Sequence, residues 1–308
     1  MGRYVARRVL QMLPVMIGTT FLIFMMVWAL PGDPFAGRCG QRPCAAAFVQ
    51  AETERLHLDQ PLVVQYGYFL LNLLHGDFGT LSNGDTVLHQ LTRAFPITIK
   101  LTAVAITFEI VLGIGLGIIA ALRRGRAFDR FTLLSSLVAI SFPIFVIGFV
   151  IQYVFGVRLG WFRVTVQPGA PWQDLIMPGF VLASLSLAFV LRLTRASLLE
   201  TLNADHVRTA VAKGLPRGLV IRRHIVRNSL IPVVTYIGAD VGILIGGAIV
   251  TEGIFNIQGI GGLLFTAIKL RENATVVSVT TVLVLIVLLV NLLVDLFYAV
   301  LDPRIRYE

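Results

Sequence analysis

Long apolar runs recur along the whole chain, and they constrain its fold more than any other feature. Six of them are about 20 or more residues long, at about residues 9–30, 96–122, 131–155, 175–199, 230–251 and 275–300. At about 1.5 Å per residue, each run is long enough as a helix to cross a hydrocarbon layer of about 30 Å. Only 14% of the residues are charged. The sequence therefore predicts an all-α integral membrane protein with six transmembrane helices.

The basic residues predict which side of the membrane each segment faces. If the N-terminus is cytoplasmic, 17 of the 26 Lys and Arg residues fall in inner segments and eight in outer segments, with Lys100 inside the second span. Because cytoplasmic segments are enriched in Lys and Arg, we expect both termini in the cytoplasm. The net charge of +9 then lies mostly on the face that meets anionic lipid and cytoplasmic partners, so it gives no support to a nucleic-acid-binding function.

A large outer loop, residues 31–94, follows the first helix. Its turn clusters, together with the helix-like spacing of Val64, Tyr68 and Leu71, predict a small folded outer cap. We therefore divide the chain into an N-terminal region, residues 1–95, and a five-helix core, residues 96–308.

The cysteines and three of the histidines also lie in this outer loop. Cys39 and Cys44 are on the oxidising side and are spaced so that they can bridge a tight turn. Two unpaired thiols, or a bond to another chain, are the alternatives. His57, His75 and His89 are too widely spaced to predict a metal site, and we expect them to be solvated surface residues.

Two carboxylic acids, Glu109 and Asp240, fall near the middle of predicted spans. Ionisable residues at this depth face protein or water, so each needs a reason. One hypothesis is a polar translocation path or a proton relay, and the other is a hydrogen bond between helices. Pro143 and Pro232 are predicted to kink the third and fifth spans, as in helices that line a pathway. The candidate path residues are thus Glu109, Pro143 and Asp240.

The inner loop at residues 200–229 is basic and carries clear helix signals. Asp205 is placed to cap a short helix, Lys213 suits its C-terminal end, and Gly214 supplies a left-handed residue after it. Pro216 then begins a second helix. The loop thus predicts two short helices below the membrane. Composition alone favours a basic helix bound to lipid headgroups.

Motifs in this loop and beyond it resemble a known family. The stretch Arg208-Thr-Ala-Val-Ala-Lys-Gly214 is followed by His224 and Leu230-Ile-Pro232. Further motifs are Pro31-Gly-Asp-Pro34, Gly76-Asp-Phe-Gly79, Glu252-Gly-Ile-Phe255, Gly259-Ile-Gly261 and Leu301-Asp-Pro-Arg304. Together they resemble the B-type permease subunit of dipeptide and oligopeptide ABC importers, with the glycine placed as in the E-A-A-x-x-x-G motif. The chain departs from that pattern at Arg208, where the motif has Glu, and at His206 and Val211, where Tyr and Arg are usual.

The resemblance implies a multi-pass subunit of the bacterial inner membrane that forms half of a translocation path for peptides or related small substrates. The implied partners are a homologous second permease, two cytoplasmic ATPase subunits or one fused ATPase, and an extracytoplasmic substrate-binding protein. This chain would bind no cofactor, because ATP and Mg are expected on the ATPase subunits. The helix at 205–214 would couple to an ATPase, with contacts through Asp205, Arg208, Thr209, Ala210, Ala212, Lys213 and Gly214.

The sequence contains no G-x-x-x-x-G-K-[ST] phosphate loop, which agrees with a transport subunit that is not itself an enzyme. The alternative is an ion-coupled secondary transporter that uses Glu109 and Asp240 as a proton relay. A membrane scaffold is disfavoured, because it would need no carboxylates in mid-span. The substrate stays open among dipeptides, oligopeptides, nickel and haem.

Overall fold

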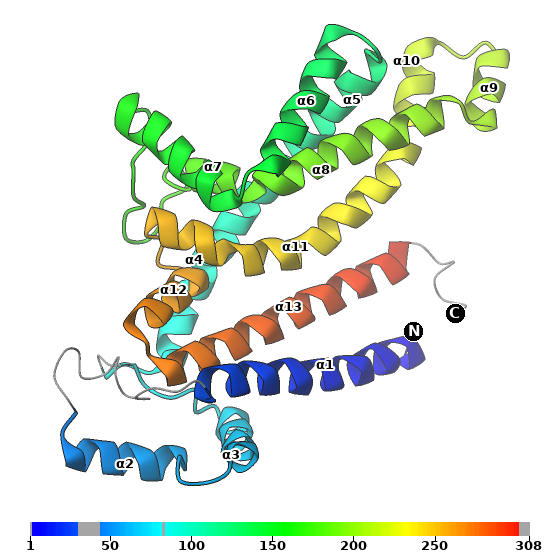
Figure 1. Cartoon of the computed structure of the whole chain (residues 1–308). Helices are drawn as coiled ribbons and strands as arrows, with labels where there is room; N and C mark the ends of the chain where they lie inside the picture. Colours follow the sequence, from blue (N-terminus) through cyan, green and yellow to red (C-terminus); the bar gives the residue numbers. More distant parts are fainter. Residues whose placement is uncertain (1, 30–43, 82–83, 302–308) are drawn as a thin grey trace. The chain divides into compact units, whose positions relative to one another are not determined.

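The computed structural model describes residues 2–29, 44–81 and 84–301, and its regular elements within these ranges are helices. They form two compact units (Figure 1). Unit 1 comprises the described residues up to Ile99 and from Asn256 onward, and unit 2 is Lys100–Phe255. The predicted division between residues 95 and 96 remains a prediction.

Five helical runs in the described residues are long and apolar enough to cross a membrane. They are α1 (Gly2–Trp28); α4 (Val87–Phe108) with η1 (Glu109–Ile114) and α5 (Gly115–Leu122); α8 (Ile176–Leu202); α10 (Arg217–Leu219) with η3 (Val220–Val226) and α11 (Arg227–Phe255); and α13 (Asn273–Leu301). The segments η1 and η3 are π-helical turns inside continuous helices. The all-α membrane fold is therefore confirmed, with a sixth span if the bent pair described next is one span.

The predicted third span is broken and not merely kinked. It consists of α6 (Ala127–Ser141), α7 (Ile144–Ile151) and η2 (Gln152–Arg158), and its two parts are bent by 107°. Phe142 and Pro143 at the break are both extended, with ψ of 138° and 144°. Proline forces the residue before it out of the helical conformation, which explains the break. Pro232, in contrast, lies inside α11, which continues through it.

In unit 1, α1 and α13 run side by side (Figure 1). The outer cap contributes α2 (Ala46–Leu56) and α3 (Leu62–Leu74), and α12 (Ile260–Leu270) precedes α13. A core of Phe24, Tyr66 and Val277 joins α1, α3 and α13. The Tyr66 hydroxyl lies 2.8 Å from Thr20 Oγ1 of α1, so the cap is tied to this helix by a buried hydrogen bond as well as by packing.

The helix-like spacing predicted in the outer cap corresponds to α3, but the three residues that carry this spacing are exposed. Val64, Tyr68 and Leu71 are 42%, 41% and 52% exposed, whereas Gln65 and Tyr66 are buried. The helix is apolar on nearly all sides, so its periodicity could not select the packed face.

In unit 2, α8 packs against α11, α5, α6 and α7. Two glycines on the neighbouring run let the backbones approach closely. A Cβ at Gly113 would lie 2.8 Å from Val190 Cγ1, and one at Gly117 would lie 2.8 Å from the Leu191 carbonyl oxygen. Side chains at these positions would therefore force α5 and η1 away from α8.

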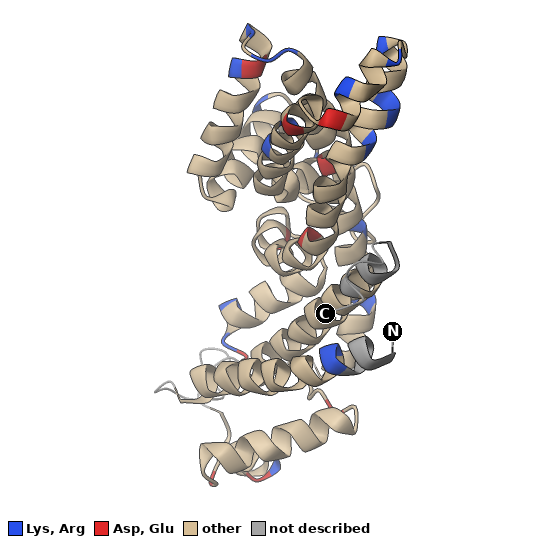
Figure 2. Ribbon diagram, turned by 90° about the vertical axis from the view of Figure 1, so that its right-hand side faces the viewer, with Lys and Arg blue, Asp and Glu red and all other residues tan. Residues whose placement is uncertain are grey.

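Basic residues gather at the end of unit 2 that carries the α5–α6 turn, α9 (Asp205–Ala212) and α10 (Figure 2). A bidentate ion pair stabilises this end. Arg195 Nε and Nη2 of α8 donate to Asp129 of α6 at 2.5 and 2.9 Å, and the Gly125 N–H donates to the same carboxylate at 2.8 Å. Sequence analysis did not identify this pair, because the partners are 66 residues apart.

Candidate functional site

The helix α9 is a short, well-terminated element between two long helices. Its C-cap is Lys213, and Gly214 follows with φ +75°, as its predicted left-handed role requires. The Gly214 N–H donates to Val211 O at 2.9 Å, and the Leu215 N–H donates to Ala210 O at 3.4 Å. This is the Schellman pattern, which satisfies the last carbonyls of the helix and reverses the chain.

Two details of the predicted loop are wrong. Asp205 is the first residue of α9 and not its cap; Ala204 holds the N-cap position, and no side chain caps this end. Asp205 still places a negative charge at the positive end of the helix dipole. The second short helix is also not separate. The helix that begins at Arg217 continues through η3 into α11 as one run to Phe255, because the residues between them contain no helix breaker.

One face of α9 is buried in unit 2. Val207 and Ala210, three residues apart, pack in a cluster with Ala121 of α5, Leu198 of α8 and Ile225 of η3. Because residues at i and i+3 share a helix face, α9 rests on its own protein through this stripe. Ala210, which we expected among the ATPase contacts, therefore faces inward and anchors the helix.

The opposite face of α9 is exposed. Of the predicted coupling residues, all but Ala210 are exposed: Asp205, Arg208, Thr209, Ala212, Lys213 and Gly214. Val211, which sequence analysis did not select, is 60% exposed beside them. The Asp205–Arg208 pair, at 3.9 Å and open to solvent, adds little to the stability of the helix.

The two mid-span carboxyl groups are brought together by the fold. Glu109 is the first residue of η1, Asp240 lies in α11, and they are 0% and 1% exposed. Their carboxyl groups interact electrostatically with each other. Three of their four oxygens are buried without a hydrogen-bond partner among the described residues. Pro143 is not part of this pair, because it lies at the break before α7.

Tyr236 completes this buried polar group and was missed by sequence analysis. It lies about one turn before Asp240 in α11, interacts with Asp240 and Ser186, and stacks on Phe189 at a centroid distance of 4.4 Å. Its i,i+4 spacing from Asp240 was the available signal. A π-helical turn in mid-span is a frequent mark of a functional position, which makes η1 and the carboxyl pair the candidate interior site.

The cysteines and histidines of the outer loop add no further candidate site within the described residues. Cys39 lies outside the described residues, so its pairing with Cys44 remains a prediction. Within residues 2–29, 44–81 and 84–301, no three His, Cys, Asp or Glu residues come together as a metal site. His57 departs from the expected solvated state, because it stacks on Tyr68 at a centroid distance of 3.9 Å.

Comparison with known proteins gives a family match over nearly the whole length. Residues 113–307 match the family of binding-protein-dependent transport system inner membrane components, and residues 1–102 match its N-terminal region. The chain is 36% identical to the dipeptide transport system permease protein DppB of Alkalihalophilus pseudofirmus, over 99% of both chains. It is also 36% identical to the glutathione transport system permease proteins GsiC of Pectobacterium atrosepticum and Escherichia coli, over 100% of each chain.

Proposed function

The chain belongs to the family of binding-protein-dependent transport system inner membrane components, the permease subunits of ABC importers, and we propose that it forms half of a translocation path for short peptides. The named relatives carry dipeptides and glutathione, which supports peptides over nickel or haem. The comparisons do not support the alternative of an ion-coupled secondary transporter.

The proposed assembly contains a homologous second permease, two ATPase subunits or one fused ATPase, and an extracytoplasmic binding protein. In it, ATP and Mg are bound by the ATPase subunits and not by this chain. The proposal places α9 in a groove of one ATPase. The observation that carries it is the division of α9 into a buried anchoring stripe, Val207 and Ala210, and an exposed face that ends at Gly214.

A helix that only bound lipid headgroups would need no such anchor, because its apolar face would point into the membrane. In α9 the apolar face is instead occupied by residues of the same chain. What remains exposed is short, mixed in character and held in one orientation, which suits a protein groove.

Uptake by the reconstituted complex tests the importer function. The full complex in proteoliposomes is supplied with the binding protein and a labelled dipeptide outside. The vesicles should accumulate peptide only when ATP is inside them, on the same side as the ATPase subunits. An uncoupler should leave this uptake unchanged. Uptake that persists without ATP and collapses with the uncoupler would contradict the proposal and favour the ion-coupled alternative.

A further inference from the structure

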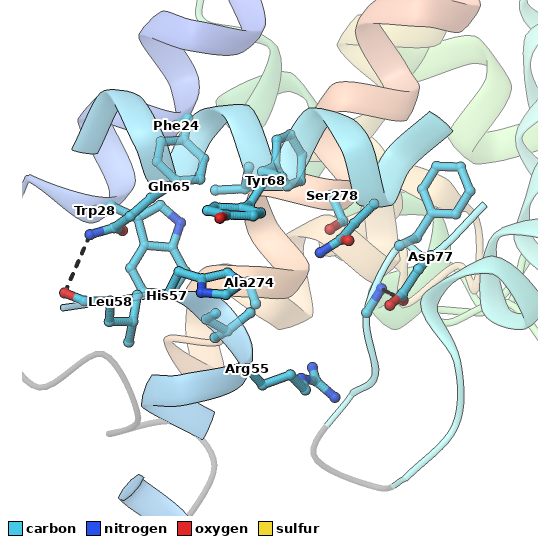
Figure 3. Close-up of a pocket in the computed structure, with 16 residues that line it drawn as sticks. Phe24, Trp28, Arg55, His57, Leu58, Gln65, Tyr68, Asp77, Ala274 and Ser278 are labelled. Atoms are coloured by element: carbon cyan, nitrogen blue, oxygen red, sulfur yellow. Dashed lines mark hydrogen bonds between the residues drawn. The ribbon is translucent and has the colours of Figure 1, made fainter. Parts of the chain in front are cut away.

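A pocket of about 70 Å³ lies within unit 1, between the outer cap and two membrane helices (Figure 3). Phe24 and Trp28 line it from the C-terminal end of α1, and Ala274 and Ser278 line it from the first turns of α13. The remaining walls are the end of α2, the α2–α3 turn, α3 and the loop at 77–79. The space exceeds the 10–15 Å³ or so that a single water needs, so it can hold a group of several atoms.

Gln65 of α3 presents an unused acceptor in this pocket. Its side chain is 6% exposed, and its Nε2 donates to Gln60 O at 2.8 Å and to Leu58 O at 3.4 Å. These two carbonyl acceptors fix which end of the amide is nitrogen. The Oε1 atom is then buried and has no hydrogen-bond partner among the described residues. A buried acceptor left in this state costs stability, so a ligand with an N–H or O–H donor would relieve it.

Aromatic side chains form part of the walls around this acceptor. Figure 3 places Gln65 beside Phe24 and Trp28, with His57 stacked on Tyr68 as a further wall. Asn72, Asp77 and Ser278 also line the pocket, so part of its wall is polar. The rings of Phe24 and Trp28 can contact an apolar side chain.

A cation lies at the edge of the same pocket. Arg55 lines it and is 44% exposed, and its contact with Glu52 is 3.6 Å, which is longer than a hydrogen bond. A guanidinium in this setting suits a carboxylate. The pocket thus offers an acceptor for an N–H, apolar walls for a side chain and a cation for a carboxylate.

We propose that this pocket binds the C-terminal residue of a short peptide that carries an apolar side chain. The peptide N–H donates to Gln65 Oε1, the side chain contacts Phe24 and Trp28, and the carboxylate pairs with Arg55. The inference rests on the proposed function for its ligand class, but it concerns a separate site in the outer cap. This site would hold peptide in the outer cap independently of ATP.

Trp28 allows a direct test with the full chain in nanodiscs. Replacing Trp161 and Trp172 with phenylalanine leaves Trp28 as the single reporter of the pocket. N-acetyl-leucine carries all three features of the proposed ligand, so it should change the Trp28 emission saturably. N-acetylglycine lacks the side chain, N-acetyl-leucinamide lacks the carboxylate, and N-acetyl-N-methyl-leucine lacks the N–H; each should bind at least fivefold more weakly.

Variants test the same contacts from the protein side. Gln65→Leu should lower the affinity for N-acetyl-leucine about five- to tenfold, as loss of one buried hydrogen bond predicts. Gln50→Leu is the matched control, because Gln50 is exposed on α2 and does not line the pocket; it should bind as the parent does. Arg55→Gln should lower the affinity for N-acetyl-leucine but leave the affinity for N-acetyl-leucinamide unchanged. Because Gln65→Leu also removes two bonds to the α2–α3 turn, Ala274→Leu, which fills the pocket from α13, provides a second loss-of-binding variant.

Equal affinity for N-acetyl-leucine and its N-methyl form, or unchanged binding in Ala274→Leu, would overturn the proposal. An unchanged emission up to millimolar probe would show that only solvent fills the pocket and would also overturn it. The measurement uses neither ATP nor partner subunits. Its failure would therefore leave the importer function standing, and failure of ATP-driven uptake would leave this binding result standing.

Discussion

Replacing Gly214 with valine tests whether the direction in which the chain leaves α9 matters for coupling. Gly214 has φ +75°, and no atom lies within 4 Å of the position that a Cβ would take. The cost of a side chain is therefore backbone strain and not collision, at about 1–2 kcal/mol for a β-branched residue. This corresponds to a change of about 5- to 30-fold in the population of the native loop.

That strain is large for α9 and small for the rest of the protein. The anchor of α9 consists mainly of Val207 and Ala210, and full burial of one valine is worth about 1.5–3 kcal/mol. The strain is of similar size, so it should disturb the Schellman turn and shift the exposed face of α9. Membrane insertion depends on long apolar helices that do not involve Gly214, so abundance should stay near that of the parent.

The assay is stimulated ATP hydrolysis and peptide uptake by the assembled complex in nanodiscs and proteoliposomes. Gly214→Val should assemble but lose most stimulation and uptake, and Gly214→Asn, which tolerates a left-handed backbone, should retain more. Gly218→Val is the matched control. Gly218 lies four residues later, is equally open around its Cβ position and has an ordinary φ, so this variant should couple normally. Normal stimulation in Gly214→Val, or equal loss in Gly218→Val, would refute the reasoning.

Three further predictions follow from the topology and the inner end of unit 2. In a cysteine-free background, an impermeant maleimide added outside should label Trp161→Cys and miss Arg124→Cys; the reverse pattern would contradict the predicted sidedness. The two cysteines of the outer loop should appear as one linked peptide, 2 Da lighter than the reduced form, in unreduced mass spectra, and two free thiols would remove the disulfide. Asp129→Asn should lower stability by about 2–3 kcal/mol, read as a lower thermal midpoint of the purified chain, because it leaves the Arg195 cation without its buried partner; an unchanged midpoint would show that the pair contributes nothing.

The sequence was sufficient for the helices whose existence depends on length and apolar content. The predicted second span, residues 96–122, lies inside the continuous run from Val87 to Leu122, and the fourth and sixth spans agree within a few residues. The left-handed Gly214 was also predictable, because the helix before it has a clear end and only glycine takes this conformation at low cost.

Features that depend on tertiary packing were less accessible. Pro143 predicted a distortion, but a proline does not reveal whether a helix bends slightly or turns by 107°. The pairing of Glu109 with Asp240 joins residues 131 positions apart, and no local pattern connects them. Similarly, the motif did not reveal that Ala210 is buried while its neighbours are exposed. The buried stripe of α9 is defined by the residues that it packs against, and these are distant in sequence.

The packing of unit 2 suggests how movement of α9 would reach the carboxyl pair. The cluster under α9 contains residues of α8 and of η3, and η3 continues directly into α11. Asp240 lies 23 residues after Arg217 on this run, about 35 Å along a helix. A rigid helix transmits a displacement over this length without needing a chain of side-chain contacts.

Glu109 is held differently from Asp240. It belongs to η1, which Gly113 brings into close contact with Val190 of α8. If α9 moved α11 relative to α8, the relative position of the Glu109 and Asp240 carboxyl groups would therefore change. These groups are poorly solvated while buried together and gain hydration when water reaches them. Their burial would thus favour opening of the interior once α11 begins to move, and an open interior would then present their polar groups to a peptide in transit.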